Sequence, residues 1–336
     1  MDLNIARQRS DTSARSRSRA RLTGSRWPAD RPPPTRLVES GISEHDPNEE
    51  RLEAQSGLML PQDGHVHSEW SWDAPGGSME RTCARAVAIG LPAIAFTEHA
   101  DYTTWTILDS GPEADDDLTA LATPQGQFTP PELDVDGYLE CLQRCRDRFP
   151  DLTIKSGVEL GEPHWHDAAV AALLGTGRFE LALGSLHCLS AGQQLVGVSK
   201  LYSERPPADV VREYLAEIPS LIEASDAFSV LAHIDYPLRD WPAEAGQYQL
   251  DGFQEEFRHA LRVLARSGRA LEINTEGPLL PHIARWWREE GGMAVTFGSD
   301  AHEPDTLARQ FHDAAAMAES CGFRPSSSPC DPWPKC

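Results

Sequence analysis

The strongest constraint on the fold is an alternation of short apolar runs with amphipathic stretches, repeated seven times between residues 61 and 323. The apolar runs predict strands at 61–67, 92–98, 153–159, 179–186, 228–234, 269–275 and 293–299. Helical periodicity between them predicts helices at 79–90, 137–149, 166–177, 208–225, 253–268 and 282–292. Seven βα repeats predict an α/β fold, and the pattern alone fits either a barrel or a doubly wound sheet.

Two connections between these elements are long for an α/β domain. They cover residues 101–135, which are rich in Gly, Pro and Asp, and residues 190–207. Long loops in compact domains often serve as lids or binding loops. Both connections are therefore expected to border a functional site.

The two ends of the chain have a different composition. Residues 1–55 are rich in Arg, Ser and Pro and contain too little apolar surface to offset the entropy of ordering, so they are predicted to be a disordered tail. Residues 324–336 (RPSSSPCDPWPKC) are predicted to be a flexible C-terminal tail. The folded domain is accordingly expected to span 56–323.

Charge is distributed unevenly and bears on the class of partner. Residues 1–36 contain nine arginines and three acidic residues, whereas the remainder contains 21 basic and 49 acidic residues, a net charge of −28. A body this acidic repels a phosphate backbone, so nucleic acid is not favoured as a partner. If the protein acts on an anion, bound metal or local arginines must reverse the field.

The compartment follows from what the chain lacks. No apolar run approaches the ~18 residues of a membrane span, and no apolar segment follows the N-terminal charges as in a signal peptide. The seven cysteines are odd in number and show no CxxC spacing, which favours reduced thiols. A cytoplasmic protein without a membrane partner is expected, and the oligomeric state stays open.

Residue types that bind metals stand at the C-terminal ends of six of the seven predicted strands: His65 and His67, His99, Glu159, His187, His233, and Asp300 with His302. In an α/β barrel these ends converge on one face. Alternate residues of a strand share a side, so His65 and His67 can reach one ion. Any single histidine is equally well explained as a core or surface residue. The coincidence at six strand ends predicts a site for Zn²⁺, Mn²⁺ or Fe²⁺.

Six motifs carry a resemblance to a known family: DGHVHSEWSWDA, FTEHAD, GVELG, GSLHC, LAHID and FGSDAHEP. In this order they resemble the successive motifs of the polymerase-and-histidinol-phosphatase (PHP) superfamily, nearest its histidinol-phosphatase branch. The resemblance covers about 61–323 and implies a distorted seven-stranded, TIM-like (βα)7 barrel. It also implies a trinuclear centre, with His65, His67, Glu159 and Asp300 at the first metal, Glu159 (bridging), His187 and His233 at the second, and His99, His302 and Asp73 at the third.

The activity implied by the resemblance is metal-dependent hydrolysis of a small phosphomonoester, as in the histidinol phosphatases of histidine biosynthesis. Two or three divalent ions activate a water, Glu159 and Asp300 belong to the catalytic centre, and Arg239 holds the substrate phosphate. Two positions depart from the family pattern. Asp73 stands where several members have His, and Glu276 stands in a loop where the branch tends to have a basic residue. A second phosphate anchor is therefore expected to be missing.

Two other functions remain open at this point. One is a PHP-type phosphodiesterase or exonuclease acting on nucleotides, and the other is a non-catalytic metal-binding scaffold. The acidic body disfavours a long polyanion, and a lapsed site usually loses ligands. Smaller features also have two interpretations: His164 and His166 as ligands or as structural residues, and Trp70, Trp72 and Trp165 as an aromatic wall or as packing.

Overall fold

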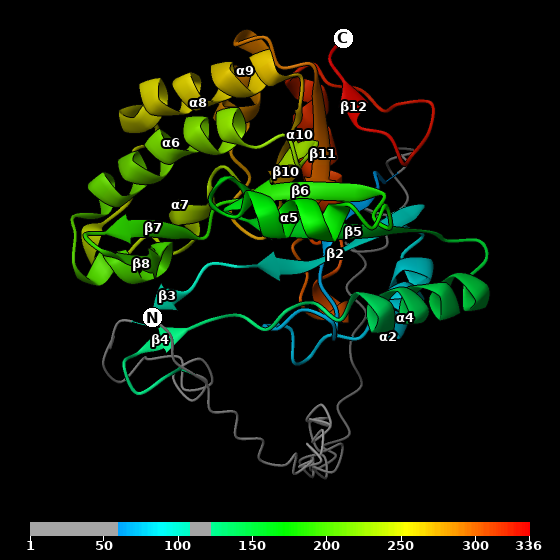
Figure 1. Cartoon of the computed structure of the whole chain (residues 1–336). Helices are drawn as coiled ribbons and strands as arrows, with labels where there is room; N and C mark the ends of the chain where they lie inside the picture. Colours follow the sequence, from blue (N-terminus) through cyan, green and yellow to red (C-terminus); the bar gives the residue numbers. More distant parts are fainter. Residues whose placement is uncertain (1–59, 108–121) are drawn as a thin grey trace, which may run out of the picture. The chain divides into compact units, whose positions relative to one another are not determined.

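The computed structural model describes residues 60–107 and 122–336, so the predicted disordered tail at 1–55 lies outside the described residues. An eight-stranded sheet forms its centre (Figure 1). In spatial order its strands are β1 (Asp63–Val66), β2 (Ala93–Asp101), β5 (Thr153–Gly161), β6 (Leu181–Ser185), β9 (Val230–Leu231), β10 (Ala270–Asn274), β11 (Ala294–Gly298) and β12 (Trp333–Pro334). The first seven pair in parallel and confirm the seven predicted strands.

The order of the strands decides between the two folds that the sequence left open. A doubly wound sheet reverses its strand order at a switch point, whereas here the order follows the chain. The sheet also curls back on itself. The His67 N–H donates to the Ala301 carbonyl (2.9 Å) and the Asp300 N–H to the His65 carbonyl (2.8 Å), which joins the end of β1 to the segment after β11. An isolated β-bridge, Val66 to Ala301, closes the barrel here in place of a continuous ladder between two strands. The barrel is therefore distorted.

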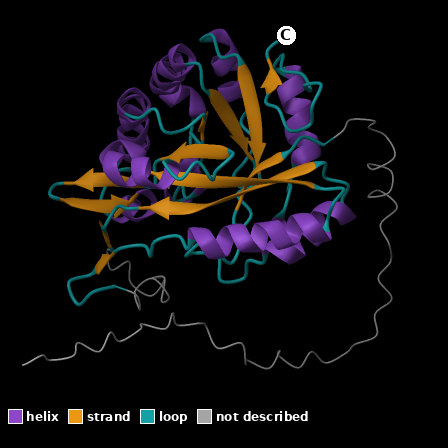
Figure 2. Cartoon of the chain, turned by 45° about the vertical axis from the view of Figure 1, so that its right-hand side comes forward, coloured by secondary structure: helices purple, strands orange, loops and turns teal. Residues whose placement is uncertain are grey.

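The main helices lie on the outside of the sheet (Figure 2). They are α2 (Met79–Ala88), α4 (Val135–Arg148), α5 (Asp167–Leu174), α6 (Pro207–Ala224), α8 (Gln254–Ser267), α9 (Pro281–Glu289) and α10 (Phe311–Ser320). Each of the six predicted helices is present with ends shifted by a few residues. In α8, Phe257, Leu261 and Leu264 are buried. Their spacing of four and three residues places them on one face, which packs on the core.

Short elements occupy the long connections at the C-terminal ends of the strands. The hairpin of β3 (Trp105–Thr106) and β4 (Gln127–Phe128) lies in the first, and that of β7 (Cys188–Ala191) and β8 (Gln194–Gly197) in the second. The remaining elements are a short helix, α7 (Tyr236–Arg239), and the 3-10 helices η2 (Pro163–Trp165), η3 (Val198–Ser203), η4 (Ala243–Ala245), η5 (Leu250–Phe253) and η6 (Pro304–Thr306). In the part of the chain that the structure describes, no helix is both long and apolar enough to cross a bilayer.

The C-terminal segment 324–336 differs from the flexible tail that its composition predicts. β12 pairs antiparallel with β11, with Trp333 opposite Val295. The Trp333 side chain is 3% exposed, and its ring centroid lies 4.8 Å from that of Phe297. The Lys335 N–H also donates to the Met293 carbonyl (2.8 Å). The prediction was wrong because a single large aromatic side chain anchors a segment that is otherwise rich in Pro and Ser.

Replacing this anchor is expected to destabilise the barrel without touching its chemistry. Trp333→Ala leaves a cavity beside Phe297 and should lower the free energy of unfolding by about 3–5 kcal/mol. The kcat should not change, because Trp333 lies at the N-terminal end of β11, away from the strand ends that carry the histidines. Urea unfolding measured beside kcat checks this, with Trp333→Phe as the milder variant. Unchanged stability would mean that the segment does not pack on the barrel.

Candidate metal centre

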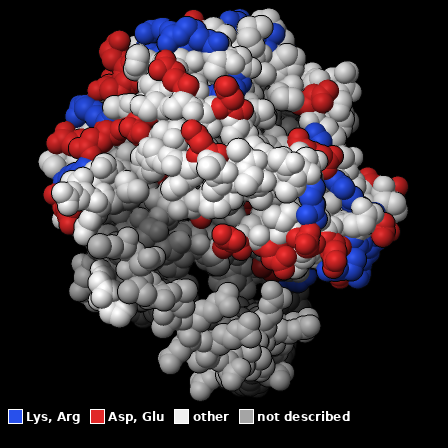
Figure 3. Space-filling model, in the orientation of Figure 1, with Lys and Arg blue, Asp and Glu red and all other residues white. Residues whose placement is uncertain are grey.

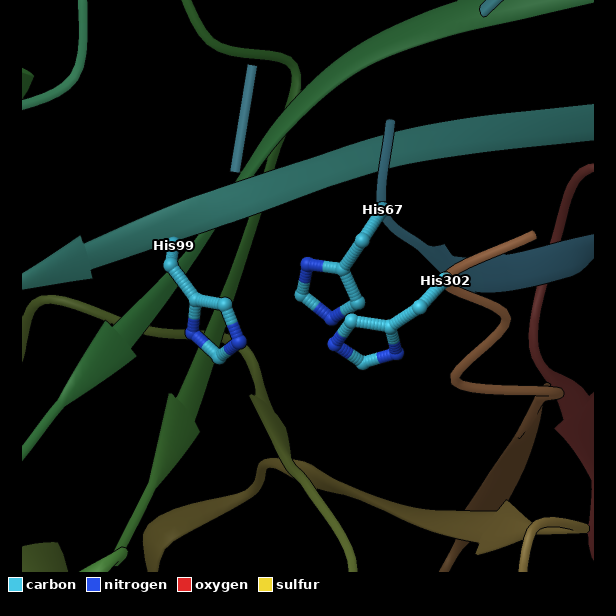
Figure 4. Close-up of side chains that lie close together, drawn as sticks. All are labelled: His67, His99 and His302. Atoms are coloured by element: carbon cyan, nitrogen blue, oxygen red, sulfur yellow. The ribbon is translucent and has the colours of Figure 1, made fainter. Parts of the chain in front are cut away.

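The nine predicted ligands come together at the C-terminal ends of the strands. Eight of them lie at or just beyond a strand end, and the ninth, Asp73, comes from the loop after β1. Seven of the nine are buried, and His302 is the most exposed, at 30% of its side chain. Figure 4 shows the rings of His67, His99 and His302 gathered at one place although they come from three segments of the chain. The sequence therefore located the cluster correctly, while the ligand role of each residue stays a proposal.

The Glu159 carboxylate lies at the centre of the cluster. Its Oε2 is 3.2 Å from His65 Nε2, 3.4 Å from His67 Nε2 and 3.2 Å from His99 Nδ1. Its Oε1 is 2.9 Å from His233 Nε2 and 3.2 Å from His187 Nε2. One carboxylate thus faces five imidazoles, the position that a ligand shared by two ions requires.

Asp300 completes a group with the two histidines of the first strand. Its Oδ1 lies 3.2 Å from His67 Nε2 and 3.4 Å from His65 Nε2, and these two nitrogens are 3.1 Å apart. Two imidazole nitrogens on one tetrahedral ion, each about 2.0–2.1 Å from it, are separated by about 3.3 Å. The spacing of His65, His67 and Asp300 therefore suits a common ion.

Asp73 joins the histidines of the third group. Its Oδ2 lies 3.1 Å from His99 Nε2 and 3.2 Å from His302 Nε2. An aspartate at this position thus reaches the same two rings that the resemblance assigns to the third metal. A carboxylate is a competent ligand for divalent ions.

Buried atoms without partners test whether a cation fits here. Within residues 60–107 and 122–336, Glu159 Oε2, Asp73 Oδ1 and His99 Nδ1 are buried and make no hydrogen bond. Glu159 Oε2 lacks one even though three imidazole nitrogens lie within 3.4 Å of it. Unpaired buried polar atoms are costly. Divalent cations between these atoms would satisfy them, so the donor set fits metal.

The electrostatics of the protein alone point the same way. Burial acts to lower the pKa of His99, but Asp73, Asp101 and Glu159 raise it to about 10. Burial likewise acts against the charged form of His302, but the hydrogen bond to Asp73 raises its pKa to about 9. Without metal, His99 and His302 are therefore protonated near neutral pH, and their positive charges offset the negative charges of the neighbouring carboxylates. A metal must displace those protons, so its affinity falls as the pH is lowered.

Asp101 belongs to the cluster although the sequence did not single it out as a ligand. Its Oδ2 lies 3.3 Å from His99 Nδ1, and its Oδ1 lies 3.7 Å from His187 Nδ1. Asp101, His99 and His187 form a further group able to hold an ion. The signal was present, because Asp101 stands two residues after His99 and therefore points to the same side of β2.

Glu272 was also missed, and it acts on the orientation of two histidines. Its Oε1 accepts from His65 Nδ1 at 2.8 Å, and its Oε2 accepts from the His233 backbone N–H at 2.9 Å. Because a carboxylate only accepts, His65 Nδ1 carries a proton, so Nε2, which faces Glu159, is the nitrogen that a metal would bind. Glu272 lies within β10, the sixth parallel strand and the one for which the sequence predicted no ligand.

A cavity of about 570 Å³ opens above the cluster. Its lining includes the cluster residues Asp73, His99, Glu159, His187, Asp300 and His302, the aromatic residues Trp72, Trp105 and Tyr236, and the charged residues Lys200, Arg239, Asp240, Glu276 and Arg309. Both long connections contribute, as expected. Of the three tryptophans proposed for an aromatic wall, Trp72 lines the cavity and Trp70 and Trp165 do not.

Arg239, predicted to hold phosphate, reaches this cavity from α7. Its Nη1 donates to Asp300 Oδ2 at 2.9 Å and also pairs with Glu276. The side chain is 11% exposed, and its Nε and Nη2 are buried without a partner in the described part of the chain. Burial and Asp300 raise the pKa of Glu276, against the opposing charges of Arg239, His302 and Arg309. Two guanidinium nitrogens of Arg239 thus have no acceptor among the described residues.

The histidine pair after β5 has structural partners. His164 Nε2 lies 2.9 Å from Glu217 Oε1, and His166 Nε2 lies 2.8 Å from Thr103 Oγ1. Neither belongs to a group able to hold a metal among the described residues. The structural interpretation is therefore favoured for both.

Known proteins share the sequence pattern of this chain. A family model, the PHP domain, matches residues 63–276. The chain belongs to the PHP family. It is 24% identical over 273 residues to the histidinol-phosphatase of Lactococcus lactis subsp. lactis, an alignment that covers 79% of this chain and 93% of that relative. It is 32% identical over 137 residues to the "Probable histidinol-phosphatase" of Thermotoga maritima, which covers 38% of this chain and 56% of that relative.

A solved structure confirms the PHP fold. Histidinol phosphate phosphatase (HisK) from Lactococcus lactis, crystallised with zinc, L-histidinol and phosphate, matches with a TM-score of 0.63 at 22% identity. The match covers 80% of this chain and 95% of that one. The predicted TIM-like α/β barrel and the predicted superfamily are both confirmed.

Proposed function

We propose that this PHP chain is a metal-dependent phosphomonoester hydrolase of the histidinol-phosphatase type. The observation that carries the proposal is the Glu159 carboxylate among five imidazoles on the floor of a 570 Å³ cavity. The curated relatives with this enzyme name support the reaction class. A cavity of this size admits a small metabolite.

The cluster is proposed to hold two or three divalent ions. His65, His67, Asp300 and Glu159 would bind the first, Glu159, His187 and His233 the second, and Asp73, His99 and His302 the third, with Asp101 as an additional donor between His99 and His187. When bound, divalent ions at such a site supply positive charge to the phosphoryl oxygens and lower the pKa of an attacking water. Zn²⁺, Mn²⁺ and Fe²⁺ all suit this donor set.

The protein's own residues position the substrate. Arg239 lines the cavity and would bind the phosphate, and a guanidinium matches phosphate geometry better than an ammonium. Glu272 holds the His65 ring in place through the 2.8 Å bond to Nδ1. Trp72, Trp105 and Tyr236 offer aromatic surface to the leaving group. Phosphoryl transfer needs little beyond such positioning and charge.

Histidinol phosphate is the proposed substrate. The Lactococcus protein was crystallised with L-histidinol and phosphate, the two products of that hydrolysis. The cavity has the matching chemistry, with aromatic surface for an imidazole ring and the carboxylates of Asp240 and Glu276 for an ammonium group. The ammonium group and the imidazole ring of the substrate would thus be bound above the metal cluster.

Long nucleic acids are a weaker substrate class for this chain. On the face seen in Figure 3, Lys and Arg lie in separate groups among acidic side chains. Such a surface does not attract a continuous phosphate backbone. Nucleotides and other diesters of small size are left as the alternative that an assay must address.

The assay compares esters on Mn²⁺- or Zn²⁺-loaded protein. We expect histidinol phosphate and p-nitrophenyl phosphate to be hydrolysed with a higher kcat/KM than bis(p-nitrophenyl) phosphate. Preference for the bis-ester would support the phosphodiesterase alternative. Stoichiometric metal without turnover of any ester would support a binding scaffold.

Arg239→Ala is expected to raise KM by about ten- to a hundredfold, because hydrogen bonds to charged groups are worth about 1.5–3 kcal/mol. The effect should fall mainly on KM, since Arg239 contacts the phosphate in both ground and transition states. Arg239→Lys should recover part of the loss. Metal content is measured on the same samples, because Arg239 also bonds Asp300. An unchanged KM would remove Arg239 from the substrate site.

A further inference from the structure

Arg309 is a second arginine in the cavity, and the sequence did not single it out. It lies between η6 and α10, seven residues after His302 in the chain, and lines the same cavity as Arg239 and Glu276. The sequence leads one to expect a missing second phosphate anchor, because Glu276 occupies the loop after β10. Arg309 brings a positive charge to this part of the cavity from the other side, after β11.

The backbone around Arg309 is held in a conformation that L residues avoid. Ala308 and Gln310, its two neighbours, have φ values of 53° and 56° in the left-handed region. Such strain persists only where the surroundings over-determine the chain, and it concentrates at functional sites.

Contacts on both sides hold this segment in place. The Ala308 N–H donates to Asp63 Oδ2 at 3.0 Å, and Gln310 Nε2 donates to the Thr275 carbonyl at 3.2 Å. Phe311 is 1% exposed and anchors the start of α10. The bond from Gln310 to Thr275 places Arg309 beside the loop that carries Glu276. The fold therefore fixes where the Arg309 side chain enters the cavity.

Among the residues that the structure describes, the Arg309 side chain has no ion-pair partner that would explain this arrangement. Within residues 60–107 and 122–336, it forms no ion pair, and its Nε is buried without an acceptor. By contrast, Arg258 pairs with Glu289 and Glu290. A partly buried guanidinium without an anion is costly unless a ligand supplies one.

We propose that Arg309 is a substrate-binding residue that contacts the phosphate beside Arg239, in place of the basic residue that Glu276 replaces. This inference rests on the proposed function. Glu276 pairs with Arg239 and lines the same cavity as Arg309. Substrate phosphate would be gripped by both guanidinium groups, while Glu276 remains available to a cationic leaving group.

Binding of inorganic phosphate to the Mn²⁺-loaded full chain tests this directly by calorimetry. Arg309→Ala should raise the Kd of phosphate and the KM of the best phosphomonoester by about ten- to a hundredfold, the value of a charge-assisted bond. Metal content should not change. Arg309→Lys should lie between Arg309→Ala and wild type. Arg285→Ala, an exposed arginine on α9 outside the cavity lining, should match wild type and controls for the lost charge.

Three outcomes would overturn the inference. A folded Arg309→Ala protein with wild-type phosphate Kd and KM removes Arg309 from the site. A raised KM with unchanged phosphate Kd assigns Arg309 to the leaving group instead. If Arg309→Ala does not fold, Arg309→Gln is measured instead. A wild-type phosphate Kd and KM in Arg309→Gln would likewise remove Arg309 from the site. A wild-type protein that hydrolyses no phosphomonoester is a different failure, which refutes the proposed function itself.

Discussion

Glu159→Gln is expected to lower kcat/KM by roughly a thousandfold. The substitution keeps the shape of the side chain but removes the charge that five imidazoles surround. A thousandfold loss corresponds to about 4 kcal/mol of transition-state stabilisation, which we expect when the ligand shared by two ions loses its charge. Metal content, measured by mass spectrometry on the same sample, should fall at two of the proposed sites together.

A matched control separates this effect from loss of charge in general. Glu223→Gln makes the same change on the exposed face of α6 and should leave kcat/KM and metal content as in wild type. The shared-ligand role of Glu159 would be refuted by a Glu159→Gln protein that keeps its metal and more than a tenth of its activity. Retained activity with one metal lost would mean that Glu159 binds a single ion.

The double variant His65→Ala/His67→Ala is expected to lose the first metal and nearly all activity. Both rings face Asp300 and Glu159 with Nε2 atoms 3.1 Å apart, so their removal takes two ligands from one proposed ion. Asp300 then keeps Arg239, and Glu159 keeps His99, His187 and His233, so both buried carboxylates have fewer positive partners and thermal stability is also expected to fall.

The control for this double variant is His259→Ala/His312→Ala, which removes two exposed histidines from α8 and α10. That protein should keep its metal and its kcat. Full turnover by His65→Ala/His67→Ala would show that the chemistry takes place elsewhere. Loss of activity with all metal retained would assign these histidines to the substrate instead.

Local pattern predicted most of the barrel and most of the cluster. Apolar runs and helical periodicity are short-range properties, so the seven parallel strands and the six helices could be located before the fold was known. The cluster could be predicted from the same pattern, because a metal-binding residue recurs at the C-terminal end of one predicted strand after another. The prediction did not extend to 324–336, where one buried tryptophan outweighs the composition of its neighbours.

The chain's own sequence determined the secondary structure, the acidic charge and the set of metal-binding residue types, because each depends on residues within a few positions of one another. The tertiary structure alone decided that β1 closes on the segment after β11, that Glu272 bonds His65 and His233, and that Arg309 enters the cavity. Each of these facts joins segments far apart in the chain. Such contacts depend on how strands curl and pack, and spacing along the sequence contains no record of that geometry.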